Sequence, residues 1–177
     1  MKDQPPSSIT DNTSELLLLV TGGTLDKDYN ALSGELEFSS THAPQILSQA
    51  NVSFHSVETL MLKDSLDMTQ ADREAIANAC IKASQQKIVI THGTDTMTDT
   101  ANHLKACPEL ADKVIVLTGA MRPFMLGNSD ASFNLGAAMM AADLSPNGIY
   151  ITMNGMRFEA GDVHKNKSLG IFERLRR

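Results

Sequence analysis

Three apolar runs of strand length in this chain each end in a loop that begins with threonine and contains glycine. LLLLV is followed by TGGT (residues 21–24), KIVI by THGTD (91–95) and VIVL by TGAMRP (118–123). Continuous apolar runs are typical of parallel strands buried on both faces. Ligands of open α/β sheets bind beyond the carboxyl ends of such strands. The loops therefore predict one site lined by hydroxyl groups rather than by metal ligands or imidazoles.

Helical patterns separate the apolar runs. We expect strands over residues 16–20, 52–61, 87–90, 114–117 and 148–152, and helices over 43–50, 69–83, 98–106 and 132–144. This alternation predicts the α/β class: an open, mostly parallel sheet with helices on both faces, a flavodoxin-like arrangement of three layers.

The remaining segments carry weaker signals. Residues 26–40 read as a long loop with a hairpin near Ser33-Gly34, and long loops of this kind are often functional lids. Residues 157–167 read as irregular, and residues 169–177 as a short terminal helix.

Composition and charge narrow the class of protein. The 177 residues are enough for one domain over residues 16–177, preceded by a polar, proline- and serine-containing stretch (1–15) that we expect to be a disordered tail. That stretch lacks the apolar core of a signal peptide, and no apolar run approaches the ~20 residues that span a bilayer, so we expect a cytoplasmic protein without membrane contact. A net charge of −6 argues against binding nucleic acid.

Several common catalytic motifs are absent. The chain has no GxSxG, HExxH or Walker lysine motif, and Gly22-Gly23 does not satisfy the dinucleotide pattern. Neither the five histidines nor the two cysteines have metal-ligand spacing, so we expect no metal and no cofactor. His92 alone among the histidines lies in a strand-end loop, where a structural role is the simpler interpretation.

Hydroxyl chemistry remains. A threonine attacks a carbonyl only when another group takes or shares its proton. Tyr29 follows Thr24 by five residues in the long loop and could fold back over the strand end. Thr94 and Asp95 could meet Lys165, since a desolvated lysine can serve as a base. Glycines beside the threonines would let backbone N–H groups stabilise a developing oxyanion.

A simpler interpretation exists for each loop taken alone. Glycine merely permits a chain reversal there, and Asp95 could cap the helix that begins near Thr98. Three such loops after successive strands favour the catalytic interpretation instead.

Further motifs extend the pattern into a resemblance. With TGGT (21–24), HGTDTM (92–97) and GAMRP (119–123), the chain also contains DSLDMT (64–69), SFNL (132–135) and GDVHK (161–165). In this order, from residue 16 to residue 165, they resemble the bacterial-type L-asparaginase family, amidohydrolases that convert asparagine to aspartate and ammonia. The match corresponds to the first domain of that family.

The resemblance assigns catalytic roles to five residues. Thr24 would be the nucleophile that forms an acyl-enzyme, and Tyr29 its partner from the mobile loop. Thr94, Asp95 and Lys165 would form the second activating group. Spacing alone leaves open which threonine attacks first.

The resemblance also implies substrate-binding positions, which are Gly23, Ser65, Gly93, Thr94, Asp95 and Ala120. Ser65 would hold the α-carboxylate of asparagine, and Asp95 would meet its α-ammonium group. The carbonyl of Ala120 would face the leaving nitrogen, and glutamine would be a poorer substrate.

The chain departs from the family pattern in two ways. Leu66 stands where the family often has a polar residue beside the carboxylate-binding serine. The family's second domain, which closes a neighbouring subunit's site, has no counterpart here, so we expect a homo-oligomer, a dimer or larger, in which another copy closes the site. An amino-acid-binding or sensing module with little turnover and an ammonia-producing component of an amidotransferase are the alternatives.

Overall fold

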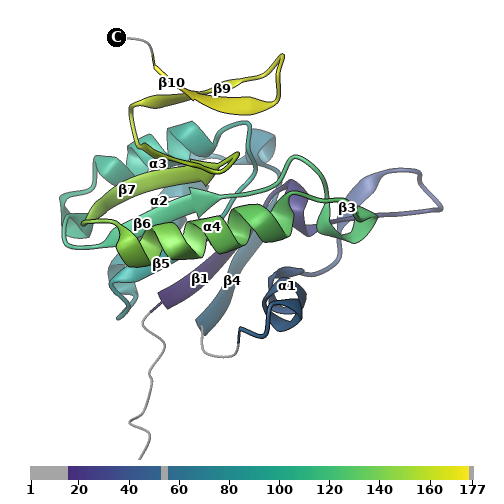
Figure 1. Ribbon diagram of the computed structural model, residues 1–177, viewed down its shortest axis with the longest axis horizontal. Coiled ribbons are helices and arrows are strands. Elements are labelled where there is room, and N and C mark those ends of the chain that lie inside the picture. Colours follow the sequence, from purple (N-terminus) through teal and green to yellow (C-terminus); the bar gives the residue numbers. More distant parts are fainter. Residues whose placement is uncertain (1–15, 53–55, 176–177) are drawn as a thin grey trace, which may run out of the picture.

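A six-stranded sheet forms the centre of the computed structural model, which describes residues 16–52 and 56–175 (Figure 1). Its strands, in spatial order, are β4 (Ser56–Lys63), β1 (Leu16–Gly22), β5 (Lys87–Thr91), β6 (Val114–Thr118), β7 (Gly148–Met153) and β8 (Met156–Glu159). The first five are parallel, and β8 pairs antiparallel with β7 at one edge. Numbered along the chain, the parallel strands have the flavodoxin-like order 2-1-3-4-5. The predicted fold class is confirmed.

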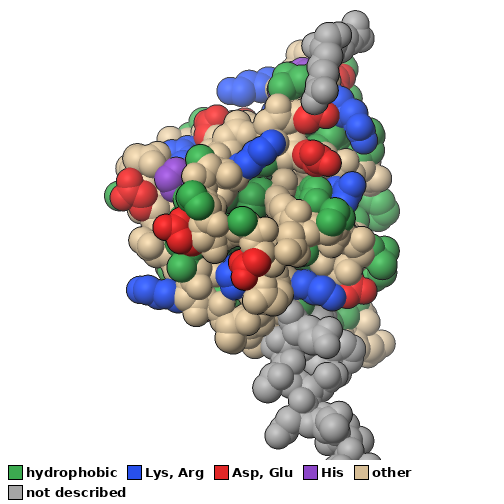
Figure 2. Space-filling view, turned by 90° about the vertical axis from the view of Figure 1, so that its left-hand side faces the viewer, with side chains coloured by type: hydrophobic (Ala, Val, Ile, Leu, Met, Phe, Trp, Pro, Cys, Tyr) green, Lys and Arg blue, Asp and Glu red, His purple; other side chains and the backbone are tan. Residues whose placement is uncertain are grey.

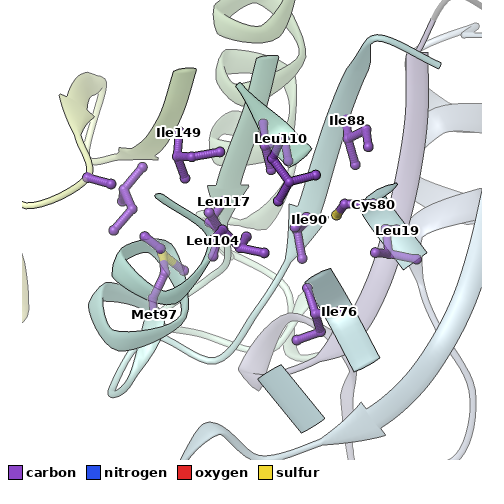
Figure 3. Packing of buried hydrophobic residues seen from close by; sticks show 14 of the residues in the cluster. Leu19, Ile76, Cys80, Ile88, Ile90, Met97, Leu104, Leu110, Leu117 and Ile149 are labelled. Atoms are coloured by element: carbon purple, nitrogen blue, oxygen red, sulfur yellow. The ribbon is translucent and has the colours of Figure 1, made fainter. Parts of the chain in front are cut away.

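In the described part of the chain, four α-helices cover the two faces of the sheet. They are α1 (Ala43–Gln49), α2 (Gln70–Lys82), α3 (Met97–Lys105) and α4 (Ala131–Leu144). Because side chains alternate along a strand, Leu17 and Leu19 of β1 pack in the cluster with α2 and α3, whereas Leu16 and Leu18 pack with α1 and α4. Figure 3 shows the first cluster between the sheet and its helices. Burial on both faces explains why the strands read as continuous apolar runs.

The hydroxyl at Thr69 begins α2 as the sequence predicts. Its side chain accepts a hydrogen bond from the backbone N–H of Asp72, and the Asp72 carboxylate accepts one from the Thr69 backbone N–H. This reciprocal pair satisfies two N–H groups that the first turn would otherwise leave free. No helix among the described residues is long and apolar enough to cross a membrane.

The long loop at 26–40 contains the hairpin that the sequence predicts. Strand β2 (Lys27–Tyr29) pairs antiparallel with β3 (Leu36–Phe38), and Gly34 takes a positive φ in the turn between them. In Figure 1 this hairpin projects from the carboxyl-end side of the sheet. Short 3-10 turns flank the loops: η1 (Thr24–Asp26), η2 (Ser65–Asp67), η3 (Pro108–Leu110) and η4 (Phe124–Leu126).

The predictions of an irregular segment over 157–167 and of a helix over 169–177 are wrong for the residues that the structure describes, which end at 175. In place of an irregular segment and a terminal helix, the chain forms β8, β9 (Val163–Asn166) and β10 (Ile171–Arg174), with β9 and β10 in an antiparallel hairpin. These strands are four residues long, and their few buried side chains, including Phe158 and Phe172, give too little alternation to reveal a strand. The tail predicted for residues 1–15 lies outside the described residues.

Candidate active site

Strands β1 and β5 are neighbours whose following connections lead to opposite sides, which makes their carboxyl ends the topological switch point of the sheet. The loops after them are in close contact. A Cβ added to Gly23 would lie 2.4 Å from the backbone nitrogen of Gly93, and one added to Gly93 would lie 2.6 Å from Ser65 Oγ. Glycine at both positions therefore brings three site loops within van der Waals distance of one another.

Lys165 of β9 joins the loop that follows β5. Its Nζ donates hydrogen bonds to Thr94 Oγ1 at 2.7 Å and to Asp95 Oδ1 at 2.8 Å. The lysine side chain is only 9% exposed, whereas that of Asp95 is 35% exposed. The Thr94 hydroxyl in turn faces Met121 Sδ at 3.6 Å. Three of the predicted residues, from segments about 70 positions apart, thus form one buried cluster with an open edge at Asp95.

Ser65 occupies the turn η2 beside this cluster. Its side chain is buried, and its Oγ accepts a hydrogen bond from the Asp95 backbone N–H at 3.2 Å. The Thr96 hydroxyl donates to the Ser65 carbonyl at 2.8 Å, which fixes the turn. Because Oγ accepts here, its own proton stays available for a ligand oxygen. Leu66, the next residue, is 69% exposed.

Thr24 and Tyr29 lie on the hairpin side of the switch point. Thr24 opens η1 and is half-buried, whereas Tyr29 at the end of β2 is 55% exposed. Within residues 16–52 and 56–175, neither hydroxyl makes a side-chain hydrogen bond, so no bond joins the two. Ala120, after β6, is fully buried. The roles predicted for these three residues stay predictions.

Two of the three threonines that begin the strand-end loops link neighbouring strands. Thr21, Thr91 and Thr118 are completely buried. Thr21 Oγ1 donates to the Thr91 carbonyl at 2.7 Å, and Thr118 Oγ1 to the Thr152 carbonyl at 2.8 Å, so both link neighbouring strands. Of the later threonines in these loops, Thr24 is half-buried, and Thr94 is buried with its hydroxyl bonded to Lys165.

His92 is buried beneath the site. Its Nδ1 lies 2.7 Å from the Gly93 carbonyl oxygen and its Nε2 lies 2.8 Å from the Thr100 hydroxyl. A neutral ring that donates from Nδ1 and accepts at Nε2 satisfies both neighbours. Burial lowers the pKa of His92 to about 4, against an ordinary value of 6.5. The ring supports the glycine loop and does not reach the open edge.

One ion pair at the site was not singled out in the sequence. Lys27, three residues after Thr24, pairs with Asp64, the residue before Ser65, with 2.5 Å between Nζ and Oδ2. Burial acts to raise the pKa of the Asp64 carboxyl, but hydrogen bonds from Lys27 and from the Leu66 backbone N–H outweigh it and hold that pKa below its ordinary value. Asp64 begins the DSLDMT motif and Lys27 lies close to Thr24 in the sequence, but neither position indicates that the two residues pair.

The rest of the described surface offers little competing chemistry. The described residues contain no cluster of three or more His, Cys, Asp or Glu side chains that could bind a metal. A hollow of about 390 Å³ lies between α3, η3 and the start of β7, away from the strand ends. On the face shown in Figure 2, acidic and basic side chains are interspersed rather than gathered into a basic surface.

Comparisons with known proteins agree with this geometry. The family model described as "Asparaginase, N-terminal" matches residues 15–172. L-asparaginase 2 of Escherichia coli is 32% identical over 170 residues, which is 88% of this chain and 47% of that protein. A glutamyl-tRNA(Gln) amidotransferase component from Methanococcus vannielii is 33% identical over 155 residues, 81% of this chain and 35% of that protein.

Solved structures show the same fold. The thermostable L-asparaginase from Thermococcus kodakarensis superposes with a TM-score of 0.74 at 31% identity, over 90% of this chain and 51% of that one. L-asparaginase I from Vibrio cholerae gives 0.79 at 26% identity, over 90% and 50%. The chain thus spans about half the length of these relatives, or less.

Proposed function

Because this chain belongs to the asparaginase family, we propose that it is an amidohydrolase that converts L-asparagine to L-aspartate and ammonia, with glutamine a poorer substrate. The observation that carries the proposal is the position of Lys165, within hydrogen-bond distance of Thr94 and Asp95 at the switch point of the sheet. A lysine beside a hydroxyl and a carboxylate, under loops that include the Thr24 turn, supplies the groups that acyl transfer requires.

The polar groups around this cluster suit an amino-acid amide. The free proton of Ser65 Oγ can bind the α-carboxylate of asparagine, and the open edge of Asp95 can bind its α-ammonium group. A charged substrate is recognised well only when both of its charges are paired. The amide side chain would then extend toward Thr24 and the carbonyl of Ala120.

In the proposed reaction, Thr24 Oγ bonds to the amide carbon, and its proton passes through Tyr29 to the nitrogen. The C–N bond breaks, ammonia leaves, and an aspartyl ester remains on Thr24. A water molecule held at Thr94 then attacks the ester carbon, the bond to Thr24 breaks, and a proton from the water returns to Thr24 Oγ. Backbone N–H groups of the glycine loops stabilise the oxyanion in each step.

The exposure of the site supports the further proposal of a homo-oligomer. The side chain of Asp95 is 35% exposed, and Tyr29 is 55% exposed. Electrostatic contacts with a substrate are weak where water reaches them, so catalysis here requires that the site be covered. A second copy that covers this edge would exclude water and confine the Tyr29 hairpin. We also propose a cytoplasmic location. The similar proteins carry names of both kinds: "probable L-asparaginase periplasmic" from Haemophilus influenzae and "probable cytoplasmic L-asparaginase" from Campylobacter jejuni.

The test is ammonia release from a panel of amino-acid amides, on protein whose assembly state has been measured by light scattering. We expect asparagine to be the best substrate. Thr24→Ala and Thr94→Ala should each lower kcat by about 100-fold or more with the fold intact, whereas Thr98→Ala on α3 should not. Inactivity of folded, assembled protein toward every amide would refute the proposal.

Two other functions make different predictions for ammonia release. The similarity to the glutamyl-tRNA(Gln) amidotransferase component from Methanococcus vannielii favours an ammonia-producing part of a larger enzyme as the second candidate. Ammonia release that requires a partner protein would support that candidate, and full activity of the isolated chain would count against it. Calorimetric binding of asparagine or aspartate without ammonia release would instead indicate a sensing module.

A further inference from the structure

The ion pair of Lys27 and Asp64 connects the hairpin to the core of the site. Lys27 is the first residue of β2, and its Nζ also lies 5.6 Å from the centre of the Phe38 ring on β3. The side chains of Lys27 and Asp64 are only 18% and 27% exposed. Partial burial shields the pair from solvent, so it is stronger than a fully exposed surface pair.

Each partner also closes the turn that carries one site residue. The backbone N–H of Lys27 donates to the Thr24 carbonyl at the end of η1. The Asp64 carboxylate accepts the Leu66 backbone N–H at 3.0 Å, which caps η2 around Ser65. The ion pair therefore joins the Thr24 turn directly to the Ser65 turn.

The charges continue beyond this pair. Asp64 also experiences the positive charge of Lys165, which is itself paired with Asp95. The site therefore contains two ion pairs, Lys27 with Asp64 and Lys165 with Asp95. Removing Lys27 would leave the Asp64 carboxylate without its ion-pair partner, and the hairpin without a charged contact to η2.

We propose that Lys27 is a positioning residue, whose ion pair with Asp64 sets the separation between Thr24 and the Ser65 subsite. The roles of Thr24 and Ser65 rest on the function proposed above, whereas the mechanical link does not. Glutamine is one methylene longer than asparagine, so a fixed separation between nucleophile and carboxylate subsite selects the shorter amide. Small displacements of a reacting group lower turnover strongly.

The experiment compares wild-type protein with Lys27→Met, Lys27→Arg, Asp64→Asn and Lys63→Met. Lys63 is a matched control because it forms a similar half-buried pair at 2.6 Å, with Asp72 of α2 rather than with the hairpin. Two readouts are measured: hydrogen exchange of backbone amides over residues 23–29, and kcat and KM for asparagine and glutamine.

We expect exchange over residues 23–29 to accelerate about fivefold or more in Lys27→Met and Asp64→Asn, but not in Lys63→Met. In Lys27→Met, kcat/KM for asparagine should fall about 30-fold or more, mainly through kcat, and the preference over glutamine should narrow. Lys27→Arg, which retains the charge, should restore both readouts to within about fivefold of wild type.

Unchanged hairpin exchange in Lys27→Met and Asp64→Asn would overturn the proposal, as would wild-type kinetics in Lys27→Met. The same effects in Lys63→Met would also overturn it, because they would reflect general destabilisation. If the wild-type protein releases no ammonia, the proposed function fails, and the exchange measurement alone still decides whether Lys27 holds the two turns together.

Discussion

Gly23 and Gly93 meet backbone to backbone at the carboxyl ends of β1 and β5, where a Cβ on Gly23 would lie 2.4 Å from the Gly93 nitrogen. Gly23 also has a φ of +88°, which is unfavourable for residues with a side chain. No rotamer change relieves a clash with backbone. The contact between the two loops therefore depends on glycine at position 23, whereas glycine at position 93 leaves room for Ser65.

We expect Gly23→Ala to lower the free energy of unfolding by about 3 kcal/mol, from the backbone clash and the positive φ together. Gly34→Ala is the matched control, because Gly34 has a φ of +76° and no atom within 4 Å of the added Cβ. It should cost only about 1 kcal/mol. Urea unfolding of the two variants measures the difference, and equal losses would show that the loops can separate without cost.

Lys165→Met should lower kcat for asparagine by about 100-fold or more, because Thr94 and Asp95 lose their shared donor. Lys167→Met removes the same charge from an exposed position after β9 and should leave kcat unchanged. Steady-state kinetics with circular dichroism as a check on folding distinguishes the two variants. Equal kcat in both would remove Lys165 from the mechanism.

The five parallel strands of the central sheet were predictable because their signals are local and repeated. Runs such as residues 16–20 are apolar throughout since both faces of the sheet are covered, and Thr69 with Asp72 forms a capping pair within one helical turn. The sequence also predicts the contact of Lys165 with Thr94 and Asp95, through the chemistry of a lysine base and the resemblance to a family. In the structure, the hairpin β9–β10 carries Lys165 to this contact.

Other features depend on contacts that local sequence does not encode. The sequence predicts an irregular segment where β9 lies and a helix where β10 lies, because these strands are short and their pairing with each other, not their own periodicity, selects the extended backbone. Lys27 and Asp64 are 37 residues apart, and either alone looks like an ordinary surface charge. Only the approach of η1 to η2 makes them partners.

His92 should make stability depend on pH. Its pKa in the folded protein is about 4, below the ordinary value of 6.5, so in this window the unfolded chain binds a proton that the folded chain does not. The free energy of unfolding should therefore fall as the pH drops from 6.5 toward 4, by at most about 1.4 kcal/mol per pH unit from this group. Above that window, His92 contributes no pH dependence.

Urea unfolding at about pH 7 and about pH 5 measures this effect, with His164→Gln as a control because the side chain of His164 is 46% exposed. The wild type and His164→Gln should show a similar fall, and His92→Gln a smaller one. If His92→Gln does not fold, the ring signals of His92 in the wild-type protein provide the test. A titration of those signals centred near 6.5 would contradict the prediction.

Leu66 offers a gain of function. It follows Ser65, its backbone N–H is held by Asp64, and its side chain is 69% exposed, so a polar side chain there should fit without repacking the core. Leu66→Gln should add one hydrogen bond to the α-carboxylate of asparagine and lower KM about fivefold to tenfold. The carboxylate does not react, so the bond is equally strong in ground and transition states and kcat should stay unchanged.

Leu32→Gln, at a residue that is 99% exposed on the hairpin, should change neither value. An unaltered KM in Leu66→Gln would mean that the α-carboxylate does not bind beside Ser65, whereas a lower kcat would mean that the added amide binds asparagine in an unproductive pose.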